Sequence, residues 1–339
     1  MNPQLFQTAQ ALVAPGKGIL AADESTPTIK KRFDSIGAKS TEESRRSYRE
    51  MLFSAPRIDK TVSGVILFDE TLRQATLDGQ PFVEFLKSRN IIPGIKVDKG
   101  AKALAGFDGE KVTEGLDGLR ERLEEYKTLG AQFAKWRAVI DIDNKKPSMG
   151  CIKANAHALA RYAALCQEVG LVPIVEPEVL MDGDHAIERC AKVTERVLRN
   201  TYRELALLRV ELEGTLLKPN MVISGKGCAE QASTQQVAEW TVQVLRRTVP
   251  AAVPGIVFLS GGQSAEQATE NLNAMNQLAN EQGGYPWQLS FSFGRALQAP
   301  ALTAWAGKTE NHDKAQQAFQ QVCEANHLAR SGQFLTKAA

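Results

Sequence analysis

The sequence of 339 residues predicts an α/β fold, a (β/α)8 TIM barrel that forms a single domain over residues 1–339. Three observations support this prediction. Eight short β-prone segments recur along the chain, and helical patterns lie between most of them. No Pro/Ser-rich linker or low-complexity tract divides the sequence. The chain is longer than a usual single domain, but barrels of this kind commonly form one domain of greater length, so its length is compatible with one barrel.

The β-prone segments and the helical patterns alternate in the way expected of βα units with parallel strands. Each segment is short and apolar enough to be a strand of a buried sheet. The eight segments are 18–23 (GILAAD), 62–68 (VSGVILF), 91–97 (IIPGIKV), 133–140 (FAKWRAVI), 171–175 (LVPIV), 215–218 (TLLK), 255–260 (GIVFLS) and 288–293 (QLSFSF).

Several of the intervening helices have readable ends. Residues 152–169 repeat apolar side chains on one helical face and stop before Gly170. Residues 233–236 and 264–267 each fit a capping box that opens an amphipathic run. A C-terminal helical tail is expected from about residue 312.

A doubly wound open sheet is the alternative architecture. It is expected to carry a G-x-G-x-x-G turn after an early strand, and the sequence has none. The GKG at 16–18 precedes a strand, so it indicates a turn and not a phosphate cradle. The barrel is therefore favoured.

Charge and composition exclude several classes of function. Lys and Arg number 41 against 39 Asp and Glu, which offers no general attraction to nucleic acid or to an anionic membrane. The N-terminus lacks the features of a signal peptide, and no window reaches the apolar length of a membrane span. A cytoplasmic location is expected.

Neither the cysteines nor the histidines form a metal-binding pattern. The five cysteines are widely spaced without a C-x-x-C pair, which indicates buried free thiols. The four histidines are scattered and form no H-x-H or H-E-x-x-H pair. No metal and no cofactor is therefore expected.

Polar residues follow the predicted strands where each strand ends. In this fold the C-terminal strand ends meet at one mouth, where catalysis takes place. Taken singly, a lysine or glutamate at a strand end is more often a solvated or paired charge. The residues are Asp23, Lys96, Lys135, Glu176, Glu178, Lys218, Ser260, Gly261, Gly262, Ser292, Gly294 and Arg295.

The convergence of several lysines and carboxylates on one mouth argues for function, because burying charges costs free energy unless they are paired or neutralised. Neighbouring ammonium groups repel each other, which lowers the pKa of a lysine and frees its neutral amine to attack a carbonyl carbon. This gives a chemical role to Lys218, which ends a short apolar strand directly before Pro219.

Two segments at the mouth are candidate phosphate sites. SGGQS (260–264) offers backbone N–H groups before a helix, and Arg295 arrives from the next strand; the alternative for the glycines is a tight turn. ESTPTIKKR (24–32) brings together the hydroxyls of Ser25 and Thr28 and the cations of Lys31 and Arg32, which could form a second anion site. The alternative for this segment is the solvated start of a helix. One phosphate at each end implies a bisphosphate.

Ordered motifs over nearly the whole chain resemble those of class I fructose-1,6-bisphosphate aldolase, the metal-free, Schiff-base type. The resemblance covers GKGILAADEST, GVILFDETL, GIKVDKG, FAKWR, IVEPE, LLKPNMV, FLSGGQS, FSFGRALQA and AWAGK. It implies reversible cleavage of fructose 1,6-bisphosphate to dihydroxyacetone phosphate and glyceraldehyde 3-phosphate. It also implies a homo-oligomer, since tetramers are typical of this family.

The resemblance implies a role for each matching residue. Lys218 matches the Schiff-base lysine and Glu176 the proton shuttle, while Asp23 and Lys135 match groups around C4 and Glu178 an accompanying glutamate. Ser260, Gly261, Gly294 and Arg295 match the C1-phosphate site, and Ser25, Thr28, Arg32 and Lys96 match groups near the C6-phosphate. Gly262 and Ser292 are predicted to be further substrate- or phosphate-binding residues.

The chain departs from the animal pattern at two places. ESTPT has Pro27 and Thr28 where the animal enzymes carry glycine and serine. The end, SGQFLTKAA, lacks the terminal tyrosine that serves C3 proton exchange, so the role of the tail does not carry over. The alternatives are an aldolase of sedoheptulose or tagatose bisphosphate, a transaldolase-like enzyme, and a binding protein on an inactive barrel.

Overall fold

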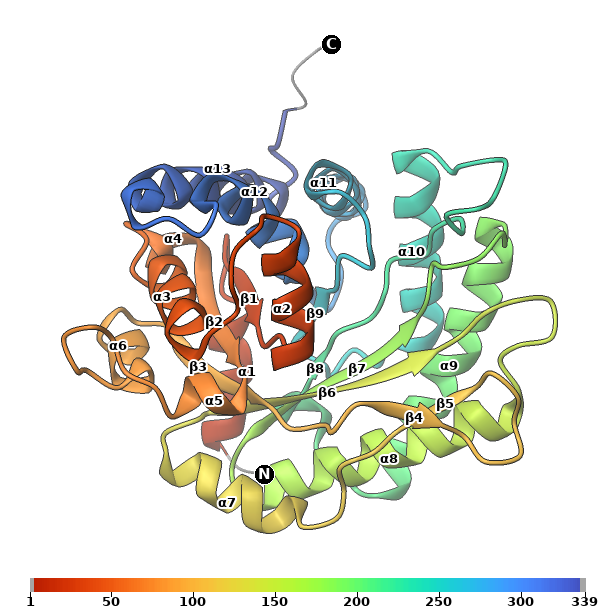
Figure 1. Cartoon of the computed structure of the whole chain (residues 1–339). Coiled ribbons are helices and arrows are strands. Elements are labelled where there is room, and N and C mark those ends of the chain that lie inside the picture. Colours follow the sequence, from red (N-terminus) through yellow and green to blue (C-terminus); the bar gives the residue numbers. More distant parts are fainter. Residues whose placement is uncertain (1–2, 336–339) are drawn as a thin grey trace.

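Eight parallel strands close into a barrel in the computed structural model of the chain, which describes residues 3–335 (Figure 1). The strands follow one another around the barrel in chain order, and the last pairs with the first. All eight predicted strands and the predicted barrel are confirmed. The barrel strands are β1 (Gly18–Ala22), β2 (Val62–Leu67), β3 (Ile92–Lys96), β6 (Phe133–Ile140), β7 (Val172–Val179), β8 (Leu216–Leu217), β9 (Gly255–Phe258) and β10 (Gln288–Phe293).

Helices surround the barrel and fill its connections (Figure 1). The capping boxes predicted at Ser233 and Ser264 are confirmed. The helices are α1 (Pro3–Leu12), α2 (Thr26–Asp34), α3 (Glu42–Phe53), α4 (Ile58–Thr61), α5 (Asp69–Leu72), α6 (Phe82–Ser88), α7 (Leu119–Thr128), α8 (Met149–Glu168), α9 (Ile187–Leu207), α10 (Thr234–Thr248), α11 (Ala265–Glu281), α12 (Arg295–Trp305) and α13 (His312–Ala329), with short 3-10 turns η1 (Leu212–Gly214) and η2 (Thr309–Asn311).

The boundaries of two predicted helical regions can be compared with the structure. Helix α8 begins three residues before the predicted start, because the Ser148 hydroxyl accepts a hydrogen bond from the Cys151 backbone N–H at 3.1 Å and caps the helix there. At the C-terminal end, α13 packs against α11 and α12. Residues 1–2 and 336–339, which the predicted domain span and tail include, lie outside the described residues.

The connection from β3 to β6 contains an antiparallel hairpin that the sequence analysis did not expect. Its strands are β4 (Ala101–Ala103) and β5 (Lys111–Thr113). The hairpin lies outside the barrel, where β5 contacts β6 and α8 (Figure 1). No helix within residues 3–335 combines the length and the apolar character that a membrane crossing requires.

Side chains alternate between the barrel interior and the surrounding helices along each strand, as the period of two requires. Alternate positions such as Leu20, Ala134 and Leu217 belong to the large apolar cluster under the helices. Helix α1 closes the N-terminal end of the barrel by packing its apolar face on the inward set. That inner cluster comprises Leu5, Ala9, Leu12, Val13, Ile19, Ala21, Ile66, Phe133, Val172, Ile174, Leu216 and Val257.

Phe133 fills space that two glycines leave open inside the barrel. A Cβ added to Gly94, its partner on β3, would stand 2.3 Å from the Phe133 ring. A Cβ on Gly64 of β2 would stand 2.6 Å from Leu12 Cδ2 and 3.2 Å from the Phe133 ring. Because packed interiors hold few voids, Phe133 takes the volume that a side chain at Gly94 would need, and Leu12 takes most of the volume at Gly64.

Candidate active site

The inward-facing side chains change from apolar to charged at the C-terminal ends of the strands. There they surround a pocket of about 660 Å³, at the end of the barrel opposite to α1. The strand period of two places each charged residue above an apolar one of the same strand. These steps run from Ile19 to Asp23, from Phe133 to Lys135, from Ile174 to Glu176 and from Leu216 to Lys218.

The structure brings all fifteen predicted site residues to the wall of this one pocket. That result concerns their position and leaves their roles as predictions. The residues are Asp23, Ser25, Thr28, Arg32, Lys96, Lys135, Glu176, Glu178, Lys218, Ser260, Gly261, Gly262, Ser292, Gly294 and Arg295.

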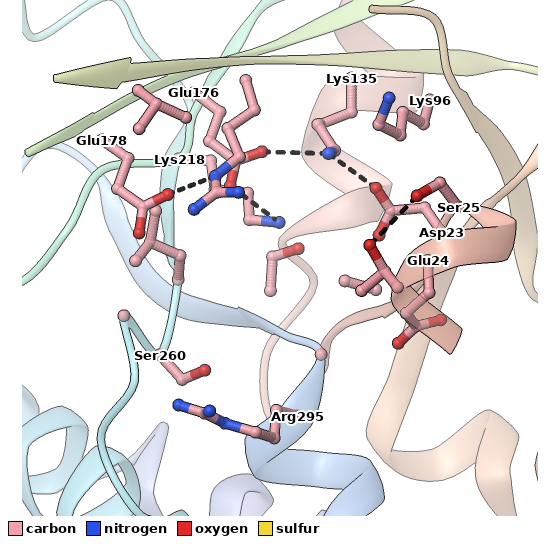
Figure 2. A pocket seen from close by; sticks show the side chains of 18 of the residues that line it. Asp23, Glu24, Ser25, Lys96, Lys135, Glu176, Glu178, Lys218, Ser260 and Arg295 are labelled. Atoms are coloured by element: carbon pink, nitrogen blue, oxygen red, sulfur yellow. Dashed lines mark hydrogen bonds and ion pairs between the residues drawn. The ribbon is translucent and has the colours of Figure 1, made fainter. Parts of the chain in front are cut away.

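Glu176 bridges two lysines at the centre of the pocket. Its carboxylate lies 3.4 Å from Lys135 Nζ and 3.5 Å from Lys218 Nζ. Lys135 Nζ also contacts Asp23 Oδ2 at 2.6 Å, so Lys135 lies between two carboxylates, as Figure 2 shows. The side chains of Lys135, Glu176 and Lys218 are each 4% exposed. The four groups therefore form a buried, alternating chain of charges.

The two buried lysines have pKa values that move in opposite directions. Burial is the main cause that lowers the pKa of Lys218; Glu176 opposes it, and repulsion from Lys135 adds to it. Burial also acts on Lys135, but Asp23, Glu176 and Asp98 together outweigh it and raise its pKa. Lys218 is thus the lysine that gives up its proton more easily, and Lys135 stays an ammonium.

Asp23 stays ionised in this surrounding. Burial alone would raise its pKa, but attraction to Lys135, Lys218 and Lys96 lowers the pKa of Asp23 well below its ordinary range. The sequence analysis expected repulsion between ammonium groups to lower the pKa of Lys218. In the structure, repulsion from Lys135 does lower the pKa of Lys218, but burial of the amine lowers it more.

Arg137 is a pocket residue that the sequence analysis missed. It follows Lys135 by two residues on β6, so it points to the same side of the strand. Its guanidinium donates to the Glu178 carboxylate, which lies two residues after Glu176 on β7. The alternation rule that places Lys135 in the barrel could have found Arg137 as well.

The loops after β9 and β10 form one polar end of the pocket. Gly261 and Gly262 adopt consecutive left-handed conformations, with φ of +54° and +82°. The exposed guanidinium of Arg295 has no hydrogen-bond or ion-pair partner within residues 3–335. Unused donors of this kind suit an anion, and Arg offers a planar fork that matches a phosphate.

The start of α2 forms a second polar end. Ser25 is the N-cap residue of α2, and its hydroxyl lies 3.1 Å from the Thr28 hydroxyl. Arg32 donates to the Glu24 carboxylate, which also accepts a hydrogen bond from Gln298 Nε2 at 2.8 Å. Lys31 lines the same end of the pocket.

Lys96 is held by Asp98, a second pocket residue that the sequence analysis missed. Lys96 Nζ donates to the Asp98 carbonyl oxygen at 2.7 Å and lies 2.8 Å from its carboxylate. As for metal ions, residues 3–335 bring no three His, Cys, Asp or Glu side chains together in a group that could hold one.

Comparison with known proteins identifies the family of the chain. The sequence model of the family described as "Glycolytic: Fructose-bisphosphate aldolase class-I" matches residues 4–339. A protein of Xanthomonas campestris pv. campestris named probable fructose-bisphosphate aldolase class 1 is 62% identical over 332 residues, which cover 98% of both chains. The Arabidopsis thaliana protein named fructose-bisphosphate aldolase 6, cytosolic, is 57% identical over 98% of this chain and 91% of its own.

A solved structure gives the same result for the fold. The structure of fructose-bisphosphate aldolase from Plasmodium falciparum superposes with a TM-score of 0.96 at 54% sequence identity. The match covers 99% of this chain and 96% of the Plasmodium chain. Together with the buried lysines of the pocket, these matches show that the chain belongs to the class I fructose-bisphosphate aldolase family.

Proposed function

We propose that this class I aldolase uses Lys218 to form a Schiff base with C2 of fructose 1,6-bisphosphate and so cleaves it reversibly to dihydroxyacetone phosphate and glyceraldehyde 3-phosphate. One observation carries the assignment to Lys218. It is the buried lysine whose pKa is lowered, and it contacts the Glu176 carboxylate at 3.5 Å, whereas the pKa of Lys135 is raised. Only an amine without its proton can attack a ketone.

Glu176 is placed to move protons during imine formation. When the Lys218 amine adds to C2, Glu176 carries the extra proton of the nitrogen to the C2 alkoxide, which gives the carbinolamine. Glu176 then takes up a second proton from solvent and gives it to the C2 hydroxyl, which leaves as water, and the iminium forms. One oxygen of the Glu176 carboxylate, Oε2, is buried without a hydrogen bond within residues 3–335 and lies 3.4 Å from Lys135 Nζ, while the other oxygen, Oε1, lies 3.5 Å from Lys218 Nζ and so faces the amine whose proton it is to take.

Cleavage follows from the iminium, which draws electrons from C3. Glu176 takes the proton of the C4 hydroxyl, the C3–C4 bond breaks, and its electron pair forms the enamine while glyceraldehyde 3-phosphate leaves. Asp23 and the Lys135 ammonium, 2.6 Å apart, hold and polarise the substrate around C4. Protonation of the enamine at C3 and hydrolysis of the iminium release dihydroxyacetone phosphate.

The two polar ends of the pocket support a bisphosphate substrate. The end with Ser260, Gly261 and Arg295 suits the C1-phosphate, and the end with Ser25, Thr28 and Arg32 suits the C6-phosphate. Both ends line the same pocket as Lys218. Turnover of fructose, sedoheptulose and tagatose bisphosphates under one set of conditions measures the preference, and fructose 1,6-bisphosphate is expected to be turned over fastest.

Borohydride trapping tests the lysine. With dihydroxyacetone phosphate present, reduction is expected to fix an adduct on the peptide that contains TLLKPNMV. The Lys218→Arg variant keeps the charge and is expected to abolish trapping, because a guanidinium is not a nucleophile at neutral pH. An adduct mapped to Lys135 or Lys96, with Lys218→Arg still active, would show that the assignment is wrong.

The cellular setting is part of the same proposal. We expect the protein in the cytoplasm, in line with the Arabidopsis relatives whose names call them cytosolic. We also expect a homo-oligomer, with a tetramer as the predicted form, which light scattering or analytical ultracentrifugation measures. No cofactor is assigned a step in this mechanism.

A further inference from the structure

Lys226 brings a second cation to the phosphate end of the pocket, although it comes from a different loop. A Cβ added to Gly262 would stand 3.2 Å from Lys226 Nζ and 3.2 Å from Arg295 Nη2. Lys226 belongs to the loop after β8, Gly262 to the loop after β9, and Arg295 begins the helix after β10. An ammonium and a guanidinium therefore both lie close to the Gly262 backbone, next to Met181 Sδ at 2.9 Å from the same Cβ, although Lys226 itself lies beside the pocket wall and not in it.

The backbone that carries Lys226 is held in place by the loop after β7. The N–H groups of residues 225, 226 and 227 donate to carbonyl oxygens of residues 185, 181 and 183 at 2.8, 2.9 and 2.8 Å. The two loops lie so close that a Cβ on Gly225 would stand 2.4 Å from the Gly183 carbonyl oxygen. This frame fixes the point from which the half-exposed Lys226 side chain starts.

The present partner of Lys226 is a weak one. Its Nζ lies 2.7 Å from Asp182 Oδ1, but the two side chains are 50% and 63% exposed. Exposed ion pairs of this kind contribute little free energy, because water screens them. A phosphate dianion offers more charge than one carboxylate, and it would also relieve the repulsion between Lys226 and Arg295.

We propose that Lys226 is a further substrate-binding residue, which contacts the phosphate on C1 of the ketose together with Arg295. This inference rests on the proposed function, since it assigns a ligand to the same phosphate end. When substrate binds, the Lys226 ammonium exchanges Asp182 for the phosphate oxygens. Its contribution is to binding, because it lies at the edge of the pocket and away from the Lys218 centre.

Steady-state kinetics of Lys226→Ala test the proposal. The KM for fructose 1,6-bisphosphate and the KM for fructose 1-phosphate are both expected to rise about tenfold, with kcat within about twofold of the wild type. The competitive inhibition constant of inorganic phosphate is expected to rise by a similar factor. Lys226→Arg is expected to restore most of the affinity, because it returns a cation to the same loop.

Two control variants separate binding from loop stability. Asp182→Asn removes the same ion pair but leaves the ammonium, so its KM is expected to stay at the wild-type value or fall. Lys60→Ala removes an exposed lysine that pairs with Asp59 at 3.3 Å, just before β2 and thus at the opposite end of the barrel. It is expected to change no kinetic constant.

Three results would overturn the proposal. The first is an unchanged KM and an unchanged phosphate inhibition constant in Lys226→Ala. The second is an Asp182→Asn variant as impaired as Lys226→Ala, since that would assign only loop stabilisation to the pair. The third is a KM that rises for the bisphosphate alone, which would place Lys226 at the other phosphate. Failure of the proposed function is distinct, because it appears as absence of a Lys218 adduct in the wild type.

Discussion

Replacement of Lys135 by methionine tests the electrostatic account of Lys218 directly. The change removes the ammonium that contacts Glu176 at 3.4 Å and keeps a side chain of similar length. Because repulsion from Lys135 helps to lower the pKa of Lys218, the pKa of Lys218 is expected to rise in this variant. Less of the amine is then neutral at pH 7, and imine formation slows.

The size of this effect follows from Coulomb's law. Two like charges about 7 Å apart repel by about 2 kcal/mol at an effective dielectric constant of about 20. Glu176 is present in both proteins, so its attraction for Lys218 cancels in the comparison. Water in the open pocket screens the repulsion further, and at an effective dielectric constant of about 30 it amounts to about 1.5 kcal/mol, or about one pKa unit. Trapping at pH 7 should therefore slow about tenfold.

The assay is the rate of borohydride trapping at saturating dihydroxyacetone phosphate, measured as a function of pH. In Lys135→Met the inflection of this profile is expected about one unit higher than in the wild type, with the rate recovering at alkaline pH. Arg137→Met, which removes a cation that also lowers the pKa of Lys218 but ranks behind Lys135, is the matched control and is expected to shift the inflection less. An inflection that stays in place or moves to lower pH in Lys135→Met would refute the reasoning.

Three other predictions concern the phosphate site, a helix cap and metal ions. Arg295→Ala is expected to weaken substrate binding by about 2 kcal/mol, or about thirtyfold in KM, and an unchanged KM would remove Arg295 from the phosphate site. Ser233→Ala removes the capping box of α10 and is expected to cost about 1 kcal/mol in urea unfolding with activity unchanged; an unchanged urea midpoint would contradict it. Activity is expected to be unaffected by EDTA, because the iminium is the electron sink, and loss that zinc restores would argue against this mechanism.

The sequence carried enough information to place the catalytic charges because strands alternate with a period of two. Lys135 lies two residues after Phe133 on one β-prone segment and Glu176 directly follows another, so their inward orientation follows once the barrel is assumed. Arg137 obeys the same rule and is predictable from its spacing of two residues to Lys135.

Other features depend on contacts that no local pattern encodes. The pairing of Lys96 with Asp98 and of Arg32 with Glu24 depends on side-chain directions in the folded loops. The hairpin of β4 and β5 has strands of only three residues, which are too short to show an alternating pattern. Lys226 reaches Gly262 across two loops, which only the three-dimensional arrangement reveals.

The volume shared by Gly94 and Phe133 has a consequence for how the chain can evolve. A larger residue at position 94 fits only if position 133 loses its ring, and a smaller residue at position 133 leaves a cavity unless position 94 grows. Neither step is neutral alone, so these two positions should covary among descendants of this sequence. Lys135 follows Phe133 by two residues on the same strand, so the two side chains point to the same side of the barrel. A change at position 133 that shifts this strand would also move Lys135, and selection for catalysis therefore acts on position 133 as well.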